Sequence, residues 1–367
     1  MRNIVNVIKS KLRLTPVSKS LFIIPISLVL VIVSLFTLLD AETINDPMNL
    51  PQDTISGSIL EVHFIDVGQA DASLILCDGK SMLVDGGNTD DSNLIYTYLK
   101  KHGIDHLDYI INTHPHEDHV GGLAGALTYA TVDTALGSVT EYDSRDFNNF
   151  LKHLDKRNVS IRVPEAGDTF SLGSAEVKIL GPVRLSEDMN NNSIVLGITY
   201  GKISFLFTGD AERDEEQDIL EQEFDLSSTV LKVGHHGSGT SSTYPFLREI
   251  MPEYAVISVG NDNSYGHPHE NVMSRLRDVG AKVMRTDTQG DIVFTSDGES
   301  VSVSSSKEIP NEDIAEITYA LNTNTKKFHY PHCSSVSETS EKNKKESDLS
   351  RDEIISQGYS PCGSCMP

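Results

Sequence analysis

The chain contains no tryptophan, and only 4 of its 367 residues are cysteine. Without tryptophan it has fewer aromatic platforms on which nucleobases could stack. Positive charge is also scarce, because 30 lysine and arginine residues are set against 53 aspartate and glutamate residues, for a formal net charge of -23. A uniformly acidic surface repels nucleic acid and anionic lipid, so bound metal ions or a local basic patch would have to attract any phosphate-bearing substrate. The charge is equally compatible with a role in solubility alone.

Charged residues are absent from Leu21 to Leu39, an apolar run long enough to cross a bilayer as a helix. Basic residues precede this run and acidic residues follow it from Asp40, which places residues 1–20 in the cytoplasm and the rest of the chain outside the cell. A cleaved signal peptide is the alternative, although Leu39-Asp40-Ala41 makes a poor cleavage site. We predict an uncleaved single-pass anchor at 21–39, and both interpretations export the remainder.

The rest of the chain divides by composition. Residues 40–56 are polar, contain Pro47 and Pro51, and are predicted to form a linker. From 57 to 303, short strand patterns alternate with helical ones, as in an α/β domain with two sheets covered by helices. A polar, serine-rich stretch from Ser302 to Asn311 starts a second linker, assigned to 304–316, and 317–367 form a separate small module. The predicted strands are Leu60–Val67, Ala72–Leu76, Ser81–Val84, Ala175–Leu180, Ser193–Tyr200, Ile203–Thr208 and Ala255–Val259, and the predicted helices include Asp91–Lys101 and Val120–Tyr129.

Metal-ligand side chains are concentrated in one short loop, which follows an apolar strand pattern at 107–112 and precedes a helix rich in small residues. Imidazole nitrogen and carboxylate oxygen are ligands that borderline divalent metals favour. In an extended loop the first two histidines point to one side, while the aspartate and the last histidine turn toward a second point nearby. This arrangement suits a pair of metal ions, as in two-metal hydrolysis. The four side chains are those of His114, His116, Asp118 and His119.

These residues match the HxHxDH signature of the metallo-β-lactamase superfamily, and further motifs resemble its ComEC-type branch. The motifs follow the order used in that branch, at Phe64–Ala72, Met82–Gly87, Phe207–Asp210, Leu231–Ser238 and Ser264–His269. The resemblance implies an αββα sandwich over 57–303 and a hydrolase that uses two divalent metal ions, either zinc or manganese.

The resemblance also implies roles for individual residues. His114 and His116 would hold the first metal, Asp118 and His119 the second, and Asp210 would bridge both. One histidine of the His-His-Gly-Ser motif should complete the second metal. We favour His236, which leaves His235 to orient a ligand or face the substrate. The remaining candidates for catalysis are Lys232, as a phosphate contact, and His267, as a proton donor to the leaving group.

The chain departs from the wider superfamily where a histidine normally finishes the first metal site. The sequence there is Met189-Asn190-Asn191-Asn192-Ser193, and the ComEC-type branch carries a similar asparagine-rich segment. The first metal would then be held by fewer protein ligands and water, or by the carbonyl of Asn191 or Asn192. Ala70 replaces the glycine of the branch and could shift the loop that carries Gln69 and Asp71. Asp66 and Asp85 are candidates for orienting the ligand histidines, or are simple turn residues.

Three of the cysteines lie in the small module at 317–367, whereas Cys77 lies alone in the larger domain. A segment of this size buries little core and usually needs a metal or a disulfide. The pairs His329-x₃-Cys333 and Cys362-x₂-Cys365 predict one structural zinc with a HisCys₃ ligand set. An oxidised or redox-active CxxC is the alternative. The spacing resembles the metal-binding module of the Ada DNA-repair protein, and DNA binding and partner docking remain equally open.

Together these patterns favour a metal-dependent phosphodiesterase, a nuclease acting on extracellular DNA. The motif set supports nucleic acid as the substrate, because both modules resemble parts of proteins that act on nucleic acid. The acidic surface and the absence of tryptophan favour a smaller substrate, such as a phosphorylcholine-type ester, a lactone or a β-lactam. A non-catalytic surface binding protein is the third possibility, and the intact ligand set argues against it. We expect no nucleotide cofactor, and no pattern indicates an oligomeric state.

Overall fold

A computed structural model describes residues 59–307, 319–331, 333–349, 351–363 and 365. The predicted anchor at 21–39 and the predicted linker at 40–56 lie outside these residues. Within the described ranges, no helix is long and apolar enough to span a membrane. The anchor therefore stays a prediction.

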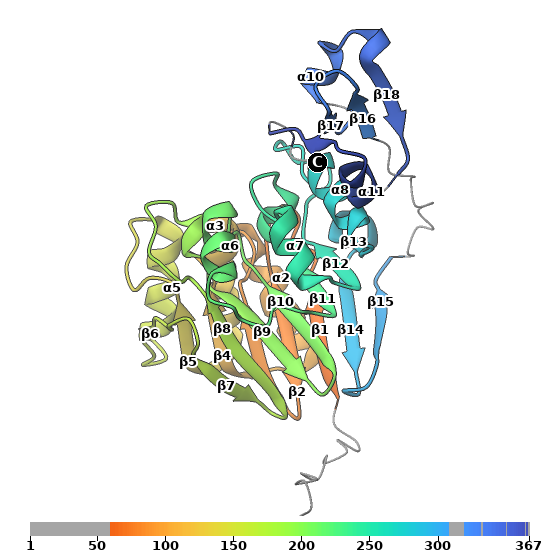
Figure 1. The fold of residues 1–367 in the computed structure, drawn as a ribbon. Helices are drawn as coiled ribbons and strands as arrows, with labels where there is room; N and C mark the ends of the chain where they lie inside the picture. Colours follow the sequence, from red (N-terminus) through yellow and green to blue (C-terminus); the bar gives the residue numbers. More distant parts are fainter. Residues whose placement is uncertain (1–58, 308–318, 332, 350, 364, 366–367) are drawn as a thin grey trace, which may run out of the picture. The chain divides into compact units, whose positions relative to one another are not determined.

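Two mixed sheets face each other between residues 59 and 307 (Figure 1). The first sheet has eight strands, in the order β15 (Val301–Ser305), β14 (Ile292–Ser296), β1 (Leu60–Phe64), β2 (Ser73–Cys77), β3 (Lys80–Val84), β4 (His106–Asn112), β5 (Thr131–Gly137) and β6 (Ile161–Arg162). The second has seven strands, in the order β13 (Lys282–Arg285), β12 (Tyr254–Ile257), β11 (Val230–Lys232), β10 (Ile203–Phe207), β9 (Val195–Tyr200), β8 (Ala175–Gly181) and β7 (Thr169–Leu172).

The strands are buried on both faces because each sheet is covered on both sides. In β3, Met82 and Val84 belong to the core between the sheets, whereas Leu83 faces the helices of the first sheet. This alternation is the period-2 pattern of a strand, and it produces a nearly continuous apolar run. Phe64 and Phe207 stack across the two sheets with ring centroids 5.6 Å apart. The inter-sheet core therefore holds the two halves together.

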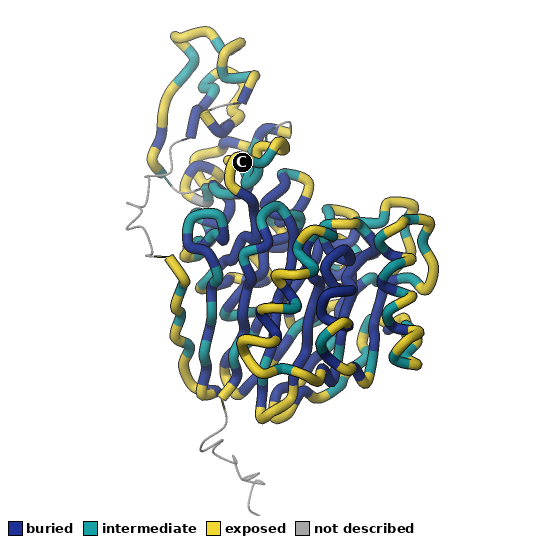
Figure 2. Tube along the Cα trace, turned by 180° about the vertical axis from the view of Figure 1, so that it is seen from behind, coloured by how far each residue is buried: buried dark blue, intermediate teal, exposed yellow. Residues whose placement is uncertain are grey.

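Helices cover the outer faces of both sheets. On the first sheet, α5 presents Phe147, Phe150 and Leu154, whose spacing of three and four residues places them on one helix face. The sandwich strands are largely buried, and exposed positions gather on the outer helices and loops (Figure 2). This arrangement confirms the predicted αββα sandwich. The helices of the sandwich are α2 (Ser92–His102), α3 (Glu117–Val120), α4 (Leu123–Tyr129), α5 (Arg145–Asp155), α6 (Arg213–Leu220), α7 (Tyr244–Ile250), α8 (Glu270–Asp278) and α9 (Thr286–Gln289), with short 3₁₀ turns η1 (Thr89–Asp91), η2 (Asn190–Asn192) and η3 (Gly234–Gly237).

One predicted boundary is wrong. The stretch starting at Ser302 was expected to be a linker, yet β15 continues to Ser305 and pairs antiparallel with β14. Val301 and Val303 pack against the inter-sheet core, and the serines alternate with them. The high serine content hid this alternation in the sequence.

The C-terminal residues form a third sheet with its own small core. Its strand order is β18 (Lys344–Ser347), β16 (Tyr319–Asn322), β17 (Lys327–His329) and β19 (Ser360–Pro361). Two short helices, α10 (Ser334–Ser337) and α11 (Arg351–Ser356), and the turn η4 (Glu341–Asn343) accompany it. The buried side chains are few, as expected for so short a segment: Tyr319, Leu321, Phe328, Tyr330, Ile354 and Tyr359.

Candidate metal centre

The first set of candidate ligands follows the carboxyl end of β4. That strand is buried and ends at Asn112, and the chain then enters a short loop before α3 starts at Glu117. Asp118 and His119 therefore occupy the first turn of α3, while His114 and His116 precede it. The Nε2 atom of His114 lies 3.0 Å from Nδ1 of His116. The loop thus brings its imidazoles and carboxylate into one place, as its spacing predicts.

The second set comes from the ends of β10 and β11, in the facing sheet. Asp210 follows Gly209, which has a φ of +50° and would hold a Cβ only in tight contact, about 3.0 Å from Thr113 and Ser193. After β11, His235 and His236 adopt φ values of +50° and +52°. Left-handed backbone is uncommon for residues other than glycine and is frequently found at functional sites. The two turns bring these side chains to the loop after β4.

The bridging position predicted for Asp210 matches its surroundings. Its Oδ1 lies 3.3 Å from Nε2 of His119. Its Oδ2 faces three imidazoles, at 3.9 Å from Nε2 of His114, 3.6 Å from Nε2 of His235 and 3.7 Å from Nε2 of His236. Two ligands of one ion, each about 2.1 Å from it, lie roughly 3–4.2 Å apart. These separations therefore fit atoms that share metal ions.

The residues also fit bound metals by a second observation. The Nε2 of His119 and Oδ1 of Asp210 are buried and make no hydrogen bond. Buried polar atoms without partners are rare, and an ion is one common explanation. The ligand atoms of Asp118, His119, Asp210 and His236 all lie within 4.8 Å of one another. This group contains His236, the histidine that the sequence favours for the second metal, and does not contain His235.

The histidines and carboxylates of the cluster shift one another's pKa values strongly. Burial alone would raise the pKa of Asp210, but the adjacent His119 and His236 hold it well below its usual range. Burial would likewise lower the pKa of His236, yet Asp210 and Asp71 raise it to about 10. The pKa of Asp118 falls to about 2, because His119 and a bond from His236 outweigh the effect of burial. The carboxylates are thus ionised and demand positive charge, which protons provide here and metal ions would provide when bound.

Hydrogen bonds fix the orientation of the histidines. Asp85 accepts from Nδ1 of His119 at 2.8 Å and from the Thr113 hydroxyl at 2.6 Å, the contacts expected of a residue that orients this histidine. The Ser258 carbonyl accepts from Nδ1 of His236 at 3.0 Å. Each bond leaves Nε2 free to bind an ion, the usual arrangement of metal-bound histidines. The role of Ser258 could not be found from the sequence, because a carbonyl contact leaves no signature in residue types.

Two other residues take roles different from those expected. Lys232 is only 2 % exposed, and its Nζ binds Asp71 at 2.8 Å and the Val233 carbonyl at 3.0 Å. It therefore neutralises a buried carboxylate and does not face a substrate phosphate. Asp71 in turn lies 3.3 Å from Nδ1 of His236. Asp66 does not orient a ligand, because its carboxylate pairs with Lys307 at 3.3 Å.

The asparagine segment before β9 does not supply a free carbonyl to the first metal. The Asn191 side-chain oxygen accepts from the backbone of Glu212 at 3.1 Å and of Glu215 at 3.3 Å. The Asn192 amide bonds both backbone groups of Ser186, at 2.7 and 2.8 Å. Both side chains hold neighbouring loops, which favours the alternative of fewer protein ligands over an asparagine carbonyl at the first metal.

The last sequence candidates lie at the edge of the cluster. The ring of His267 is 5.8 Å from that of His235, and Gln69 contacts its Nδ1 at 3.3 Å. Burial, His269 and His235 lower the pKa of His267 to about 4. It is therefore a neutral imidazole at pH 7, a poorer proton donor than the charged form. His269 accepts from the Gly239 backbone at 2.9 Å and has a structural role.

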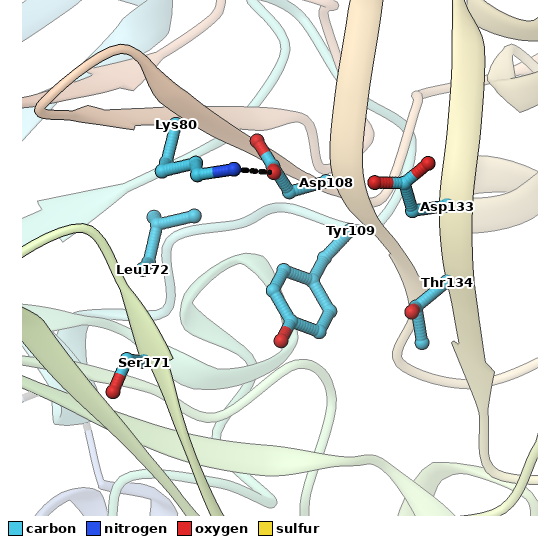
Figure 3. A pocket seen from close by; sticks show the side chains of 7 residues that line it. All are labelled: Lys80, Asp108, Tyr109, Asp133, Thr134, Ser171 and Leu172. Carbon is cyan, nitrogen blue, oxygen red and sulfur yellow. Dashed lines mark hydrogen bonds and ion pairs between the residues drawn. The ribbon is translucent and has the colours of Figure 1, made fainter.

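A separate group lies at the opposite ends of the same strands. His106 and Asp108 belong to the start of β4, far along the strand from the ligand loop, and Asp133 lies on β5. Figure 3 shows Lys80 directed at Asp108, and the two are joined by an ion pair of 2.7 Å. The backbone of Ser81 also donates to Asp108. Lys80, Asp108 and Asp133 line the pocket drawn in Figure 3. Because Lys80 neutralises Asp108, the pocket offers no set of metal ligands comparable to the cluster around Asp210.

A second candidate metal site is found in the C-terminal sheet. The ligand atoms of His329, Cys333, Cys362 and Cys365 all lie within 4.8 Å of one another, as their spacing predicts. None of the three cysteines forms a disulfide, and Nδ1 of His329 is buried without a hydrogen bond. Burial and the nearby Cys333 and Cys362 raise the pKa of Cys365 to about 12. Thiolate formation here would require a bound cation.

Comparison with known proteins agrees with this geometry. The chain is 30% identical over 256 residues to ComE operon protein 3 of Bacillus subtilis, which covers 64% of this chain and 33% of that protein. It is 31% identical over 232 residues to competence protein ComA of Neisseria gonorrhoeae, with coverage of 62% and 31%. It is 32% identical over 240 residues to recombination protein 2 of Haemophilus influenzae, with coverage of 63% and 28%. The chain thus spans about a third of the length of these curated relatives.

These similarities confirm the resemblance to the ComEC-type branch. The model of the metallo-beta-lactamase superfamily matches residues 65–261, which is more than half of the chain and includes the whole cluster around Asp210. The chain has the αββα sandwich, and its candidate metal ligands lie in the turns that follow strands of both sheets. It belongs to the metallo-beta-lactamase superfamily.

Proposed function

We propose that this protein is a metal-dependent phosphodiesterase, a nuclease that cleaves DNA outside the cell. It would use two divalent ions, zinc or manganese, held around Asp210. The observation that carries the proposal is the convergence of His114, His119 and His236 on that one buried carboxylate. The names of the relatives add support for a nucleic-acid substrate, since competence and recombination are processes that handle DNA.

The side chains of the cluster supply binding and orientation. When bound, the metals supply a water nucleophile near neutral pH and neutralise charge on the phosphate. Asp85 and the Ser258 carbonyl keep His119 and His236 in the tautomer that leaves Nε2 free. Asp210 reaches both halves of the cluster, because its Oδ1 faces His119 while its Oδ2 faces both His114 and His236. With Lys232 neutralised by Asp71, the ions themselves would provide most of the positive charge that a phosphate needs.

The second candidate is hydrolysis of a small substrate, such as a phosphorylcholine-type ester, a lactone or a β-lactam. The observation that favours it is the charge of -23, which repels a nucleic-acid strand but attracts a cationic headgroup. A non-catalytic surface binding protein is a weaker third candidate, because it gives no reason for buried ligand atoms that make no hydrogen bond, such as Nε2 of His119.

We extend the proposal to location and to the C-terminal sheet. The apolar run at 21–39 would anchor the protein in the membrane with the catalytic domain outside the cell, or be removed as a signal peptide. One structural zinc would be held by His329, Cys333, Cys362 and Cys365. This module would stabilise itself through the metal, and DNA binding is one of its possible roles.

The full-length chain, stripped of metal and resupplied with Mn²⁺ or Zn²⁺, tests the proposal. The substrates are single-stranded DNA, double-stranded DNA and bis-p-nitrophenyl phosphate, and the control is the double variant His116→Ala/Asp118→Ala. We expect metal-dependent DNA cleavage that the double variant lacks. Cleavage of the small diester alone would replace the nuclease with a small-substrate phosphodiesterase. No turnover of any of the three by the metal-loaded protein would refute a phosphodiesterase.

A further inference from the structure

The first metal position has fewer visible ligands than the second. His114 and His116 come from the loop after β4, and Asp210 faces His114 at 3.9 Å. The superfamily histidine that would complete this set is replaced by the asparagine segment, whose amides bond to the backbone of neighbouring loops. If a third imidazole completes this position, it comes from another element.

His235 is the imidazole in the right place. Its Nε2 lies 3.6 Å from Oδ2 of Asp210, the oxygen that also faces His114 and His236. This is the closest of the three imidazole contacts to that oxygen. The left-handed conformation of both His235 and His236 turns the two consecutive side chains so that each directs Nε2 at Asp210. Ordinary extended backbone would send neighbouring side chains in opposite directions.

Glu212 holds His235 in the manner of a metal-bound histidine. Its Oε1 lies 3.1 Å from Nδ1 of His235 and accepts from the Thr240 hydroxyl at 2.9 Å. A carboxylate on Nδ1 leaves Nε2 deprotonated and free for an ion, and such pairs are a common feature of metal sites. Asp85 makes the equivalent contact with His119 on the second-metal side. The cluster therefore has carboxylate–imidazole pairs on both sides of Asp210.

The asparagine segment builds this pair instead of binding metal. Asn190 reaches Oε1 of Glu212 at 3.5 Å, and Asn191 accepts from the Glu212 backbone at 3.1 Å. Ser193 accepts from the Asp210 backbone at 3.0 Å. The residues that stand where the superfamily histidine is missing thus position the carboxylate that orients His235.

From these contacts we propose that His235 is the third histidine ligand of the first metal, with Glu212 as the residue that positions it. The two histidines of the motif then serve different ions, His235 the first and His236 the second. The inference rests on the two-metal site of the proposed function, but it does not depend on which substrate is cleaved.

Manganese binding by the metal-free, full-length chain tests this assignment without any assay of activity. Mn²⁺ is chosen because thiolate sites such as the C-terminal one bind it poorly. The number of ions per chain is measured by elemental analysis after equilibrium dialysis, and paramagnetic resonance distinguishes a coupled ion pair from single ions. The variants are His235→Asn, because asparagine tolerates the left-handed backbone, and Glu212→Gln. His102→Ala, on the exposed end of α2, is the control. Circular dichroism establishes that each variant folds.

We expect two ions and a coupled spectrum for the unaltered chain and for the control. His235→Asn should keep one ion with nearly unchanged affinity, lose the coupled spectrum and bind the other ion about 100-fold more weakly. Glu212→Gln should weaken that ion about 10-fold, as loss of an orienting carboxylate typically does. Two ions with unchanged affinities in both variants would overturn the assignment and leave the metal centre intact. An unaltered chain that binds no Mn²⁺ or Zn²⁺ at this cluster would overturn the proposed function together with the inference.

Discussion

The imidazole of His119 donates from Nδ1 to the Asp85 carboxylate across 2.8 Å, and both side chains are almost fully buried. Asp85 follows β3 and His119 lies on α3, so this bond helps to link the first sheet to the helix that carries candidate ligands. Loss of the bond would let the imidazole rotate or change tautomer.

We therefore predict that Asp85→Asn weakens metal binding about 10- to 100-fold. The amide would place a donor opposite the Nδ1 hydrogen of His119, whereas its oxygen could still accept from the Thr113 backbone. Titration of the metal-free protein with Zn²⁺ at fixed pH measures the change. Asp66→Asn is the matched control, because Asp66 pairs with Lys307 outside the cluster. Equal affinities for the two variants would contradict an orienting role for Asp85.

We expect the free energy of unfolding to depend on pH through the titration of Glu215. Burial raises the pKa of this carboxyl from 4.5 to about 7, although a bond from the Val183 backbone opposes the rise. The folded protein thus keeps a proton that the unfolded chain releases at lower pH. The protonated Glu215 carboxyl contributes ~3 kcal/mol to the free energy of unfolding. This contribution is complete below pH 4.5 and is lost as the pH rises through about 7.

Glu215→Gln keeps a neutral side chain that can still accept from Val183. We expect the variant to lose less stability than the unaltered chain between pH 5 and pH 7.5, by roughly 2–3 kcal/mol. Urea unfolding at a series of pH values measures the difference. Glu221→Gln, just beyond the same helix at a site 57 % exposed, is the control. Parallel stability curves for the unaltered chain and Glu215→Gln would show that Glu215 is ionised in the folded state.

The C-terminal sheet should depend on its metal. Cys362→Ser and Cys365→Ser each remove one sulfur from the four-ligand group, and we expect either variant to hold one zinc fewer per chain. Limited proteolysis should then cut within 319–363 while the sandwich resists. Cys77→Ala is the control, because Cys77 lies in the inter-sheet core and not in this group. Full zinc content in both serine variants would rule out a HisCys₃ site.

Tyr265 distinguishes a nucleic-acid substrate from a small one. It is 67 % exposed and stacks on His267, with ring centroids 5.5 Å apart. Asn263 fixes this loop by accepting from the backbone of both Tyr265 and His267. A base stacked on such a ring contributes about 1–3 kcal/mol.

We expect Tyr265→Ala to raise the KM for single-stranded DNA about 10-fold and to leave turnover of bis-p-nitrophenyl phosphate unchanged. Tyr265→Phe keeps the ring and should retain the KM of the unaltered chain. A parallel loss of both activities would mean that Tyr265 supports the loop, and no loss at all would exclude base stacking at this position.

The ligands were accessible from sequence because they lie in short motifs with fixed spacing. His114, His116, Asp118 and His119 occupy one loop, so local order alone brings them together. The choice of His236 for the second metal agrees with its place in the compact group, which also contains Asp118 and Asp210. The apolar patterns likewise located eight of the fifteen strands of the two sheets, but not β5, β6, β7, β11, β13, β14 or β15.

The supporting contacts were not accessible, because they join residues far apart in the chain. Lys232 looked like a phosphate contact because its partner, Asp71, lies in a different motif and becomes its neighbour only when β11 is in place. The contact between Glu212 and His235 also forms across a turn of the fold, and no spacing indicates it. Residue types thus indicate the kind of chemistry, whereas contacts formed in the folded protein decide which charged side chains can bind a metal or a substrate.

The left-handed histidines after β11 have a further consequence for assembly. Each non-glycine residue in this conformation costs about 1–2 kcal/mol, and two adjacent ones form a locally unfavourable segment. Ions that bind both imidazoles would repay that cost, so the turn should close fully only when metal arrives. Metal supply would then act as the final step of maturation, and a chain deprived of ions would be recognisable by faster amide hydrogen exchange at Gly234–Gly237 than in the strands on either side.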